Sequence, residues 1–131
     1  MSGFYLIIPE EGKAAELQIN PETFAKQLSS RWEDFEIVNV NVPRDASQLS
    51  WTCNIQGESI LGDLLRGGNS VAISDMDDEQ PLAEFAVWYR TLIPFHIRLF
   101  LYHDQMAQLE IEITEHISAD EILRQLDQQV D

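Results

Sequence analysis

The stretch LSWTCNIQGESILGDLLRGGNSVAIS, residues 49–74, decides the fold class. It begins with a strict alternation of apolar and polar side chains, which is typical of a strand with one face in water. A second strand is predicted at 60–65, with Gly62 marking a bulge. A Gly-Gly-Asn turn at 67–69 then leads into a third strand. Strands joined by consecutive hairpins form an antiparallel sheet, so the stretch indicates an α+β protein rather than alternating βαβ units.

Three further segments carry apolar side chains at the spacing of an amphipathic helix. They span residues 21–32, 78–93 and 118–129. Each has side chains near its start that can cap free backbone N–H groups: Asn20, then Asp77 or Asp78, then Ser118. The second segment follows the helical spacing without a break until Pro94, which ends it.

The remaining apolar runs predict strands elsewhere in the chain. Residues 4–8 are expected to form a strand buried on both faces, and residues 35–42 a strand with valines along one face. Two more strands are expected in a hairpin whose loop covers 103–107. The predicted fold is a single α+β domain, residues 1–131, with a mainly antiparallel sheet of about six or seven strands and three helices. The expected order of elements is β-α-β-β-β-β-α-β-β-α.

The C-terminal hairpin and the second helix supply most of the expected core. Placing Leu99 opposite Ile111 sets Arg98 against Glu112, a favourable cross-strand pair. Trp88 lies at the side of the apolar stripe of its helix, where it either packs at the edge of the core or is an exposed anchor. The side chains expected to be mostly buried are Trp51, Leu82, Phe85, Tyr89, Leu99, Leu101, Leu109 and Ile111.

The charge of the chain limits the classes of partner. Twenty-three acidic residues face eight basic ones, giving a formal net charge of −15 that is spread over the whole length. Such a surface repels nucleic acids and anionic membranes, so neither is expected as a partner, and it attracts basic proteins. A single cysteine excludes an internal disulfide and indicates a reducing compartment. Because no leader or membrane-spanning run is evident, we expect a cytoplasmic protein.

No motif in the sequence predicts catalysis, a cofactor or a metal. The histidines, His96, His103 and His116, lack the spacing of metal ligands and are expected at the surface. Cys53 shares a face with apolar residues, where a thiol is inert. The acidic run 75–79 offers oxygen ligands for Mg²⁺ or Ca²⁺, but it lacks the spacing and the glycine of an EF-hand. Acids at the start of a helix are explained by its dipole and free N–H groups.

Two groups of residues are candidates for a partner-binding surface. They are Phe100, Tyr102, Glu110 and Glu112 on the C-terminal hairpin, and Asp75, Asp77 and Asp78 before the second helix. On the hairpin, the two rings and the two glutamates lie on corresponding sides of neighbouring strands, so aromatic side chains are surrounded by acids. The hairpin group is a binding surface only if its rings are uncovered, whereas we expect helix 118–130 or another helix to cover them.

These observations favour a non-enzymatic binding or regulatory protein, such as an inhibitor or immunity-type protein, that acts on a basic protein. No catalytic residue, cofactor or metal site is expected. Two alternatives stay open. The chain could be a small enzyme or small-molecule-binding domain with a pocket between the sheet and helix 78–93, its acidity serving only solubility. It could also be a subunit of a larger complex that uses its sheet face as an interface.

Overall fold

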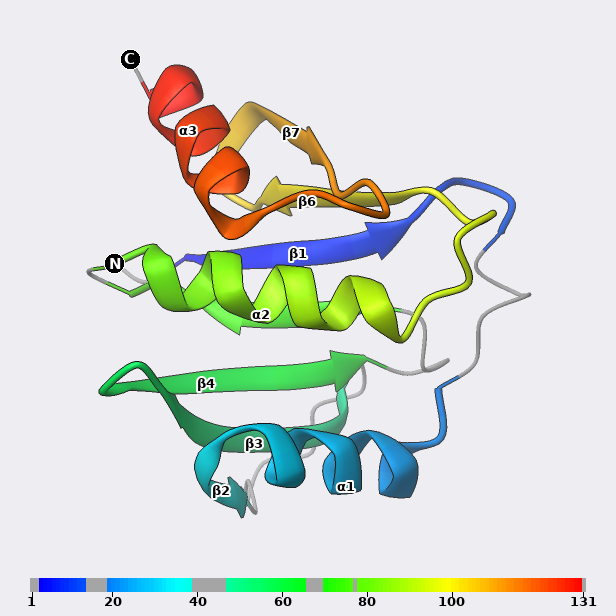
Figure 1. Cartoon of the computed structure of the whole chain (residues 1–131), viewed down its shortest axis with the longest axis vertical. Helices are drawn as coiled ribbons and strands as arrows, with labels where there is room; N and C mark the ends of the chain where they lie inside the picture. Colours follow the sequence, from blue (N-terminus) through cyan, green and yellow to red (C-terminus); the bar gives the residue numbers. More distant parts are fainter. Residues whose placement is uncertain (1–2, 14–18, 39–46, 66–69, 77, 131) are drawn as a thin grey trace.

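The structure, a computed structural model, describes residues 3–13, 19–38, 47–65, 70–76 and 78–130. Along the described chain the elements are β1 (Phe4–Pro9), α1 (Pro21–Arg31), β2 (Glu33–Ile37), β3 (Ser47–Ile55), β4 (Glu58–Leu65), β5 (Val71–Ser74), α2 (Gln80–Thr91), β6 (Leu99–His103), β7 (Met106–Glu112) and α3 (Ala119–Val130). This order confirms the predicted α+β class and the predicted succession of strands and helices (Figure 1).

The seven strands form one antiparallel sheet in the order β2-β3-β4-β5-β1-β6-β7. The strands β2 to β5 form a meander, and β6 and β7 form a hairpin. The first strand joins these two parts, because Ile7 lies opposite Val71 of β5 on one side and opposite Leu101 of β6 on the other. β1 therefore joins the meander to the hairpin by pairing with strands that lie far from it in the sequence.

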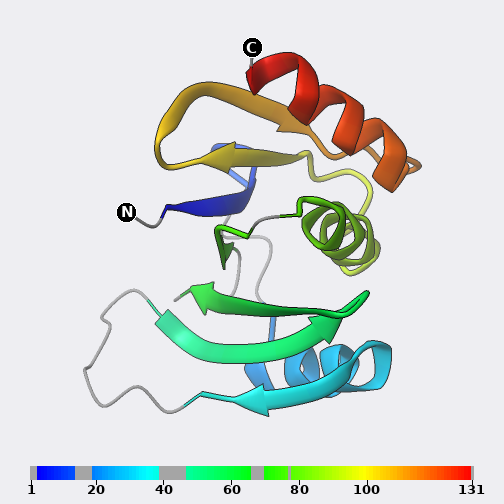
Figure 2. The ribbon, with the colours of Figure 1, turned by 90° about the vertical axis from the view of Figure 1, so that its left-hand side faces the viewer.

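All three helices lie on one face of the sheet (Figure 2). α1 packs beside β2 and β3, α2 runs over the middle of the sheet, and α3 packs against α2 and β7. The apolar side chains between the two layers form the core. The opposite face of the sheet carries none of these helices.

Local hydrogen bonds set where the outer two helices begin. Asn20 caps α1, because its side-chain oxygen accepts the backbone N–H groups of Glu22 at 2.8 Å and Thr23 at 3.2 Å. The Ser118 hydroxyl accepts the backbone N–H of Glu121 at 3.1 Å, as expected for the capping box of α3. Both starts follow from the sequence.

The second helix is shorter than predicted. It begins at Gln80 rather than at residue 78, with Glu79 as its N-cap residue and without a side-chain hydrogen bond from that cap. Asp78 instead accepts the backbone N–H of Gln80 at 3.0 Å in the preceding turn. Beyond the helix end, the buried guanidinium of Arg90 donates to the carbonyl of Ile97 at 2.9 Å, which ties the following loop to α2.

An aromatic cluster fills the core between the sheet and the helices. The ring of Trp51 on β3 lies 5.1 Å from that of Phe24 on α1 and 6.0 Å from that of Phe85 on α2. Trp88 packs against Phe24 and Trp32, so it belongs to this cluster and is not an exposed anchor. All of the side chains expected in the core are buried.

Two expectations for the strands are wrong. Gly62 forms no bulge: it lies directly opposite Trp51, and a Cβ at this position would come within 2.5 Å of Trp51 Cζ2. The glycine is required because the indole occupies the space of a side chain. Nor is β1 buried on both faces, since Tyr5 and Ile7 are buried whereas Phe4 is 37% exposed. The helices lie on one face of the sheet, and the burial of Tyr5 and Ile7 places these two side chains on that face.

The C-terminal hairpin is tighter than predicted. A two-residue turn joins β6 to β7, so His103 lies opposite Met106 within the strands. The register is shifted by two residues, with Leu101 rather than Leu99 opposite Ile111. As a consequence, His103 belongs to β6 and points to the buried face, whereas the sequence predicts it in a loop.

Two predicted segments lie partly or wholly outside the described residues. The strand expected at 35–42 corresponds to β2, Glu33–Ile37, and residues 39–42 are outside the description. The Gly-Gly-Asn turn at 67–69 is outside it as well. The strands that flank this turn do pair antiparallel, with Leu64 of β4 opposite Val71 of β5.

Candidate functional site

The face of the sheet that carries no helix is the first candidate site. Paired residues of neighbouring strands share a face, so the side chains of β1, β6 and β7 form rows across the sheet. One row holds Ile8, Phe100 and Glu112, and the next holds Leu6, Tyr102 and Glu110. We call these two rows the open-face patch. It combines aliphatic and aromatic side chains with two carboxylates at its outer edge.

The expectation that a helix covers the two rings is wrong. Leu99, Leu101 and His103 of β6 are buried beneath the helices. Phe100 and Tyr102 alternate with them, so their rings point to the other face. α3 packs against α2 and β7 on the helix side (Figure 2). The four hairpin residues predicted as a partner-binding surface therefore lie together on a face that none of the described helices covers.

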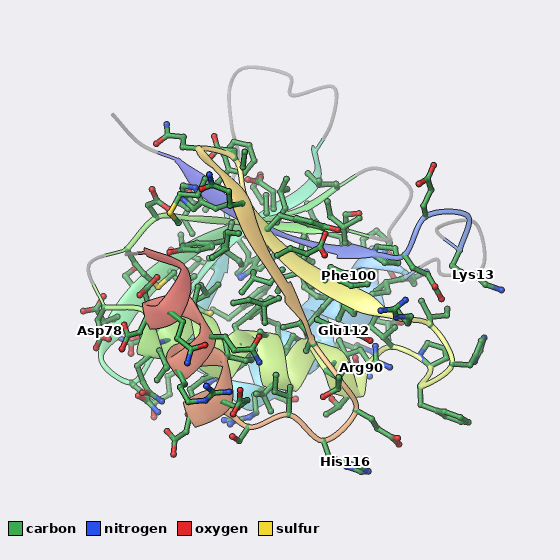
Figure 3. All side chains as sticks on the ribbon, turned by 90° about the horizontal axis from the view of Figure 1, so that it is seen from above. Lys13, Asp78, Arg90, Phe100, Glu112 and His116 are labelled. Carbon is green, nitrogen blue, oxygen red and sulfur yellow. The ribbon has the colours of Figure 1, made fainter. Side chains whose placement is uncertain are left out.

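One row of the open-face patch already holds a guanidinium. Arg98 donates from Nε to Glu112 Oε2 at 3.1 Å and from Nη2 to Glu112 Oε1 at 2.8 Å. Its guanidinium carbon lies 5.1 Å from the centre of the Phe100 ring. The hydrogen bonds from Arg98 lower the pKa of Glu112. Figure 3 shows Phe100 and Glu112 beside each other, as their pairing requires. Ring and carboxylate together bind the cation.

The other row repeats the combination of ring and carboxylate. Tyr102 lies opposite Glu110 on β7. Partial burial, and then a hydrogen bond to Glu110, raises the pKa of Tyr102. Leu6 completes the row on the other side of the ring. A phenol with one apolar and one polar neighbour is typical of side chains that anchor protein interfaces.

A second candidate site lies on the helix side of the sheet, at the end where α2 begins. An open pocket of about 440 Å³ is lined by Tyr5, Asp75, Met76, Glu79, His103, Gln105 and Met106. Tyr5 and His103 lie directly opposite each other on β1 and β6, with ring centroids 4.6 Å apart. The segment between β5 and α2 supplies Asp75, Met76 and Glu79. The pocket thus forms where the sheet meets the start of α2.

Two carboxylates bind the buried polar side chains of this pocket. The Tyr5 hydroxyl donates to Glu79 Oε2 at 2.6 Å, and burial, together with this bond, raises the pKa of Tyr5. His103 Nε2 lies 2.7 Å from Asp75 Oδ1, and the His103 side chain is only 6% exposed. His103 Nδ1 accepts the backbone N–H of Gln105 at 3.0 Å. A ring nitrogen that accepts an N–H carries no proton of its own, so this contact leaves Nε2–H to donate to Asp75.

A glycine at position 3 permits the contact between Asp75 and His103. The Gly3 N–H donates to Asp75 Oδ2 at 3.2 Å, and the Gly3 carbonyl accepts the N–H of Asp75 at 3.0 Å. A Cβ at Gly3 would lie 2.9 Å from His103 Cε1 and 3.0 Å from Asp75 Oδ2. Any side chain here would therefore displace the pair or the N-terminal backbone.

The alternative of a pocket between the sheet and helix 78–93 indicates this region but none of these residues, because the sequence places His103 at the surface. The prediction holds for His96 and His116, which are exposed, and is wrong for His103. A signal was available: His103 continues the every-second-residue pattern of Leu99 and Leu101. A two-residue turn after it would have placed it on the core face.

The acidic residues predicted as partner-binding before α2 do not join the open-face patch. Asp75 lies in the pocket on the helix side, and Asp78 is exposed in the turn before α2. Asp77 lies outside the described residues. In Figure 3, Asp78 is well separated from Phe100 and Glu112. The two predicted groups therefore belong to different surfaces.

The pocket does not assemble the residues that covalent catalysis needs. Asp75 and His103 have the contact of an orienting acid and a base, but no Ser, Thr or Cys is among the described residues that line the pocket. Cys53 is buried in β3, where burial raises its pKa to about 11 and keeps it protonated. Within the described ranges, no group of three or more His, Cys, Asp or Glu side chains could hold a metal ion.

Comparisons with known proteins identify no family. No protein-family model matches the chain. No curated protein and no solved structure matches it either. In the part of the chain that is described, no helix is long and apolar enough to cross a membrane.

Proposed function

We propose that this protein is a non-enzymatic binding or regulatory protein that docks a basic protein on its open-face patch. One observation carries the proposal: a sheet face that none of the described helices covers sets aromatic rings beside glutamates, and one such row already binds Arg98. An arginine or lysine of a partner can bind the ring and carboxylate of Tyr102 and Glu110 by the same interactions. An inhibitor or immunity-type role is the form of regulation that such docking serves best.

The overall charge supports a basic partner. The chain carries a net charge of −15, so the protein attracts a cationic surface over distances longer than a contact. Its own described cations are partly engaged, since Arg90 is buried, Arg98 binds Glu112 and Arg124 binds Glu121. These arginines therefore do little to weaken the attraction of the acidic surface for a basic protein.

The two parts of the open-face patch are expected to act on different steps of binding. Phe100 and Tyr102, with Leu6 and Ile8, form an apolar centre that controls how long a complex lasts. The glutamates at the outer edge act mainly on the rate of approach, because exposed charges steer encounter.

The proposal also concerns cell compartment and nucleic acids. The lone cysteine suits a reducing compartment, and we assign the protein to the cytoplasm on that ground. Neither DNA nor RNA is part of the proposal, because neutralising phosphates requires clustered lysine and arginine and only eight such residues stand among 23 acids.

The test uses a partner captured from a native lysate and then purified. Surface plasmon resonance with Glu110→Lys is expected to show slower association at low salt. The difference should shrink as the Debye length falls from about 10 Å at 0.1 M salt to about 3 Å at 1 M. Tyr102→Ala is expected to speed dissociation instead. The matched control is Asp127→Lys, which makes the same charge change at an exposed position of α3 on the helix side.

Three results would overturn the proposal. They are an acidic partner, an association rate that salt does not change, and a slowing by Asp127→Lys as large as that by Glu110→Lys. A permanent complex in which an uncharged surface covers the patch would favour the alternative of a subunit that uses its sheet face as an interface.

A further inference from the structure

The pocket at the start of α2 has a chemistry of its own, separate from the open-face patch. Tyr102 and His103 are consecutive residues of β6 and therefore point to opposite faces of the sheet. We propose that the pocket lined by Asp75, Glu79, Met76 and Met106 binds a small aliphatic amine in its ammonium form. This proposal does not depend on a protein partner.

The charge of the pocket calls for a cation. Its lining includes the carboxylates of Asp75 and Glu79, and no lysine or arginine is among the described residues of that lining. The groups that bind these carboxylates are the Tyr5 hydroxyl, Nε2 of His103 and the backbone N–H of Gly3. These two carboxylates therefore accept hydrogen bonds without a lysine or arginine beside them in the described lining, and an ammonium group can bind them through charge-assisted hydrogen bonds.

An anion would find few donors in the same pocket. The Tyr5 O–H is bound to Glu79, and the backbone N–H of Gln105 is bound to His103 Nδ1. The start of α2, often an anion site, adds little, because the Gln80 N–H is bound to Asp78 and the residue that follows is a proline. The pocket therefore has more hydrogen-bond acceptors than free donors, whereas a site for phosphate or carboxylate needs free donors.

The rest of the lining suits a hydrocarbon chain. Met76 and Met106 are both partly buried and pack against the core, so their side chains present flexible, polarisable surfaces to the pocket. The edge-to-face pair of Tyr5 and His103 forms a rigid wall beside them. With about 440 Å³ of space, the pocket is of the size that takes a small organic molecule rather than a bare ion.

The carboxylates are held in position before any ligand arrives. Asp75 is fixed by His103 on one oxygen and by the Gly3 backbone on the other. Glu79 is fixed by the buried Tyr5. Such preorganisation reduces the ordering cost of binding.

The test is isothermal titration calorimetry of the full chain at neutral pH with n-butylamine, 1,4-diaminobutane and butyrate. Saturable one-to-one binding is expected for at least one amine and not for butyrate. Glu79→Gln is expected to weaken amine binding by about tenfold or more, since it removes a charged acceptor. The control, Asp78→Asn, removes the same charge one residue away at an exposed position and should change affinity by less than about twofold. Methyl resonances of Met76 and Met106 should shift in the titration.

Asp75→Asn gives a second variant, because Glu79→Gln also alters the Tyr5 hydrogen bond. Thermal melts check that both variants are folded. The proposal is overturned if neither amine binds saturably to the unmodified protein, if butyrate binds as well as butylamine, or if Asp78→Asn weakens binding as much as the pocket variants. The last result would assign amine binding to the overall negative charge. None of these results changes what is expected of Glu110→Lys and Tyr102→Ala, which test partner docking on the open-face patch.

Discussion

Gly62→Ala tests whether the core is packed as the structure shows around Trp51. The added Cβ would lie 2.5 Å from Trp51 Cζ2, 2.8 Å from Cη2 and 2.9 Å from Cε2. The indole cannot move aside freely, because it is fully buried between the rings of Phe24 and Phe85. We therefore expect the substitution to destabilise the protein, although alanine suits an ordinary strand better than glycine.

The size of the effect follows from two opposing contributions. Overpacking a filled core costs about 1–3 kcal/mol. Replacing glycine by alanine restricts the unfolded chain and contributes about 0.4–1 kcal/mol in the opposite direction. The net expectation is a loss of about 1–2 kcal/mol in the free energy of unfolding. For a chain of 131 residues the unfolding entropy is about 0.28 kcal/mol per kelvin, so Tm should fall by about 4–7 °C.

A double-mutant cycle with Trp51→Phe identifies the cause. The smaller ring lacks the indole atoms that meet the new Cβ, so the two substitutions together should cost about 0.5–3 kcal/mol less than the sum of the single losses. Gly57→Ala is the control. Gly57 has a φ of +86° and nothing near its absent Cβ, so alanine there costs backbone strain alone. Its effect should be additive with Trp51→Phe.

Chemical denaturation monitored by circular dichroism measures the free energy of unfolding of the wild type and of five variants. These are the three single variants and the two double variants that combine Trp51→Phe with Gly62→Ala or with Gly57→Ala. A Gly62→Ala variant as stable as the wild type would show that the indole does not occupy the space assigned to it. Additivity of Gly62→Ala with Trp51→Phe would show that any loss has another source, such as the geometry of β4.

Three further predictions follow from burial and charge. Phe85→Ala should cost about 3–5 kcal/mol in a urea melt, whereas Phe95→Ala, at a position 74% exposed, should leave the melt unchanged. Cys53 should react slowly with a thiol reagent at mildly alkaline pH until the protein unfolds. Burial raises the pKa of Cys53 to about 11, so between about pH 8.5 and that pKa the unfolded thiol loses its proton while the folded thiol keeps it. The free energy of unfolding should therefore fall as the pH rises through this range. Arg98→Ala should raise the lowered pKa of Glu112, as measured by NMR titration, and a pKa that does not move would contradict the bidentate pair.

The helices and the class of fold could be predicted because their signals are local. Asn20 and Ser118 are found as the caps that the sequence indicates, and each acts within three residues of its own position. The buried faces of α2 and of β3 follow from spacings that the chain itself carries. The order of strands in the sheet is not local in this sense. It depends on β1 meeting β5 and β6, and no short stretch specifies that meeting.

The sequence pointed to the four hairpin residues of the open-face patch but not to Leu6 and Ile8, and it could not show that the helices leave this face of the hairpin uncovered. Period-two alternation shows that Phe100 and Tyr102 share a face, and it does not show which face the helices cover. The Arg98–Glu112 pair was likewise expected from a register that proves wrong by two residues. The long arginine side chain reaches Glu112 diagonally, so the ion pair survives the error in register.

The residues of the pocket could not be predicted, because the position of His103 depends on the length of one turn. A five-residue loop would leave His103 in solvent, whereas the two-residue turn keeps it in β6, opposite Tyr5 and within reach of Asp75. A polar residue at a position where the alternation predicts a buried apolar side chain departs from the local pattern. Such departures tend to occur at functional sites. The sequence contains this departure at His103, following Leu99 and Leu101. A polar side chain placed in phase with a core face is therefore better tested as a buried, hydrogen-bonded group before it is assigned to a loop.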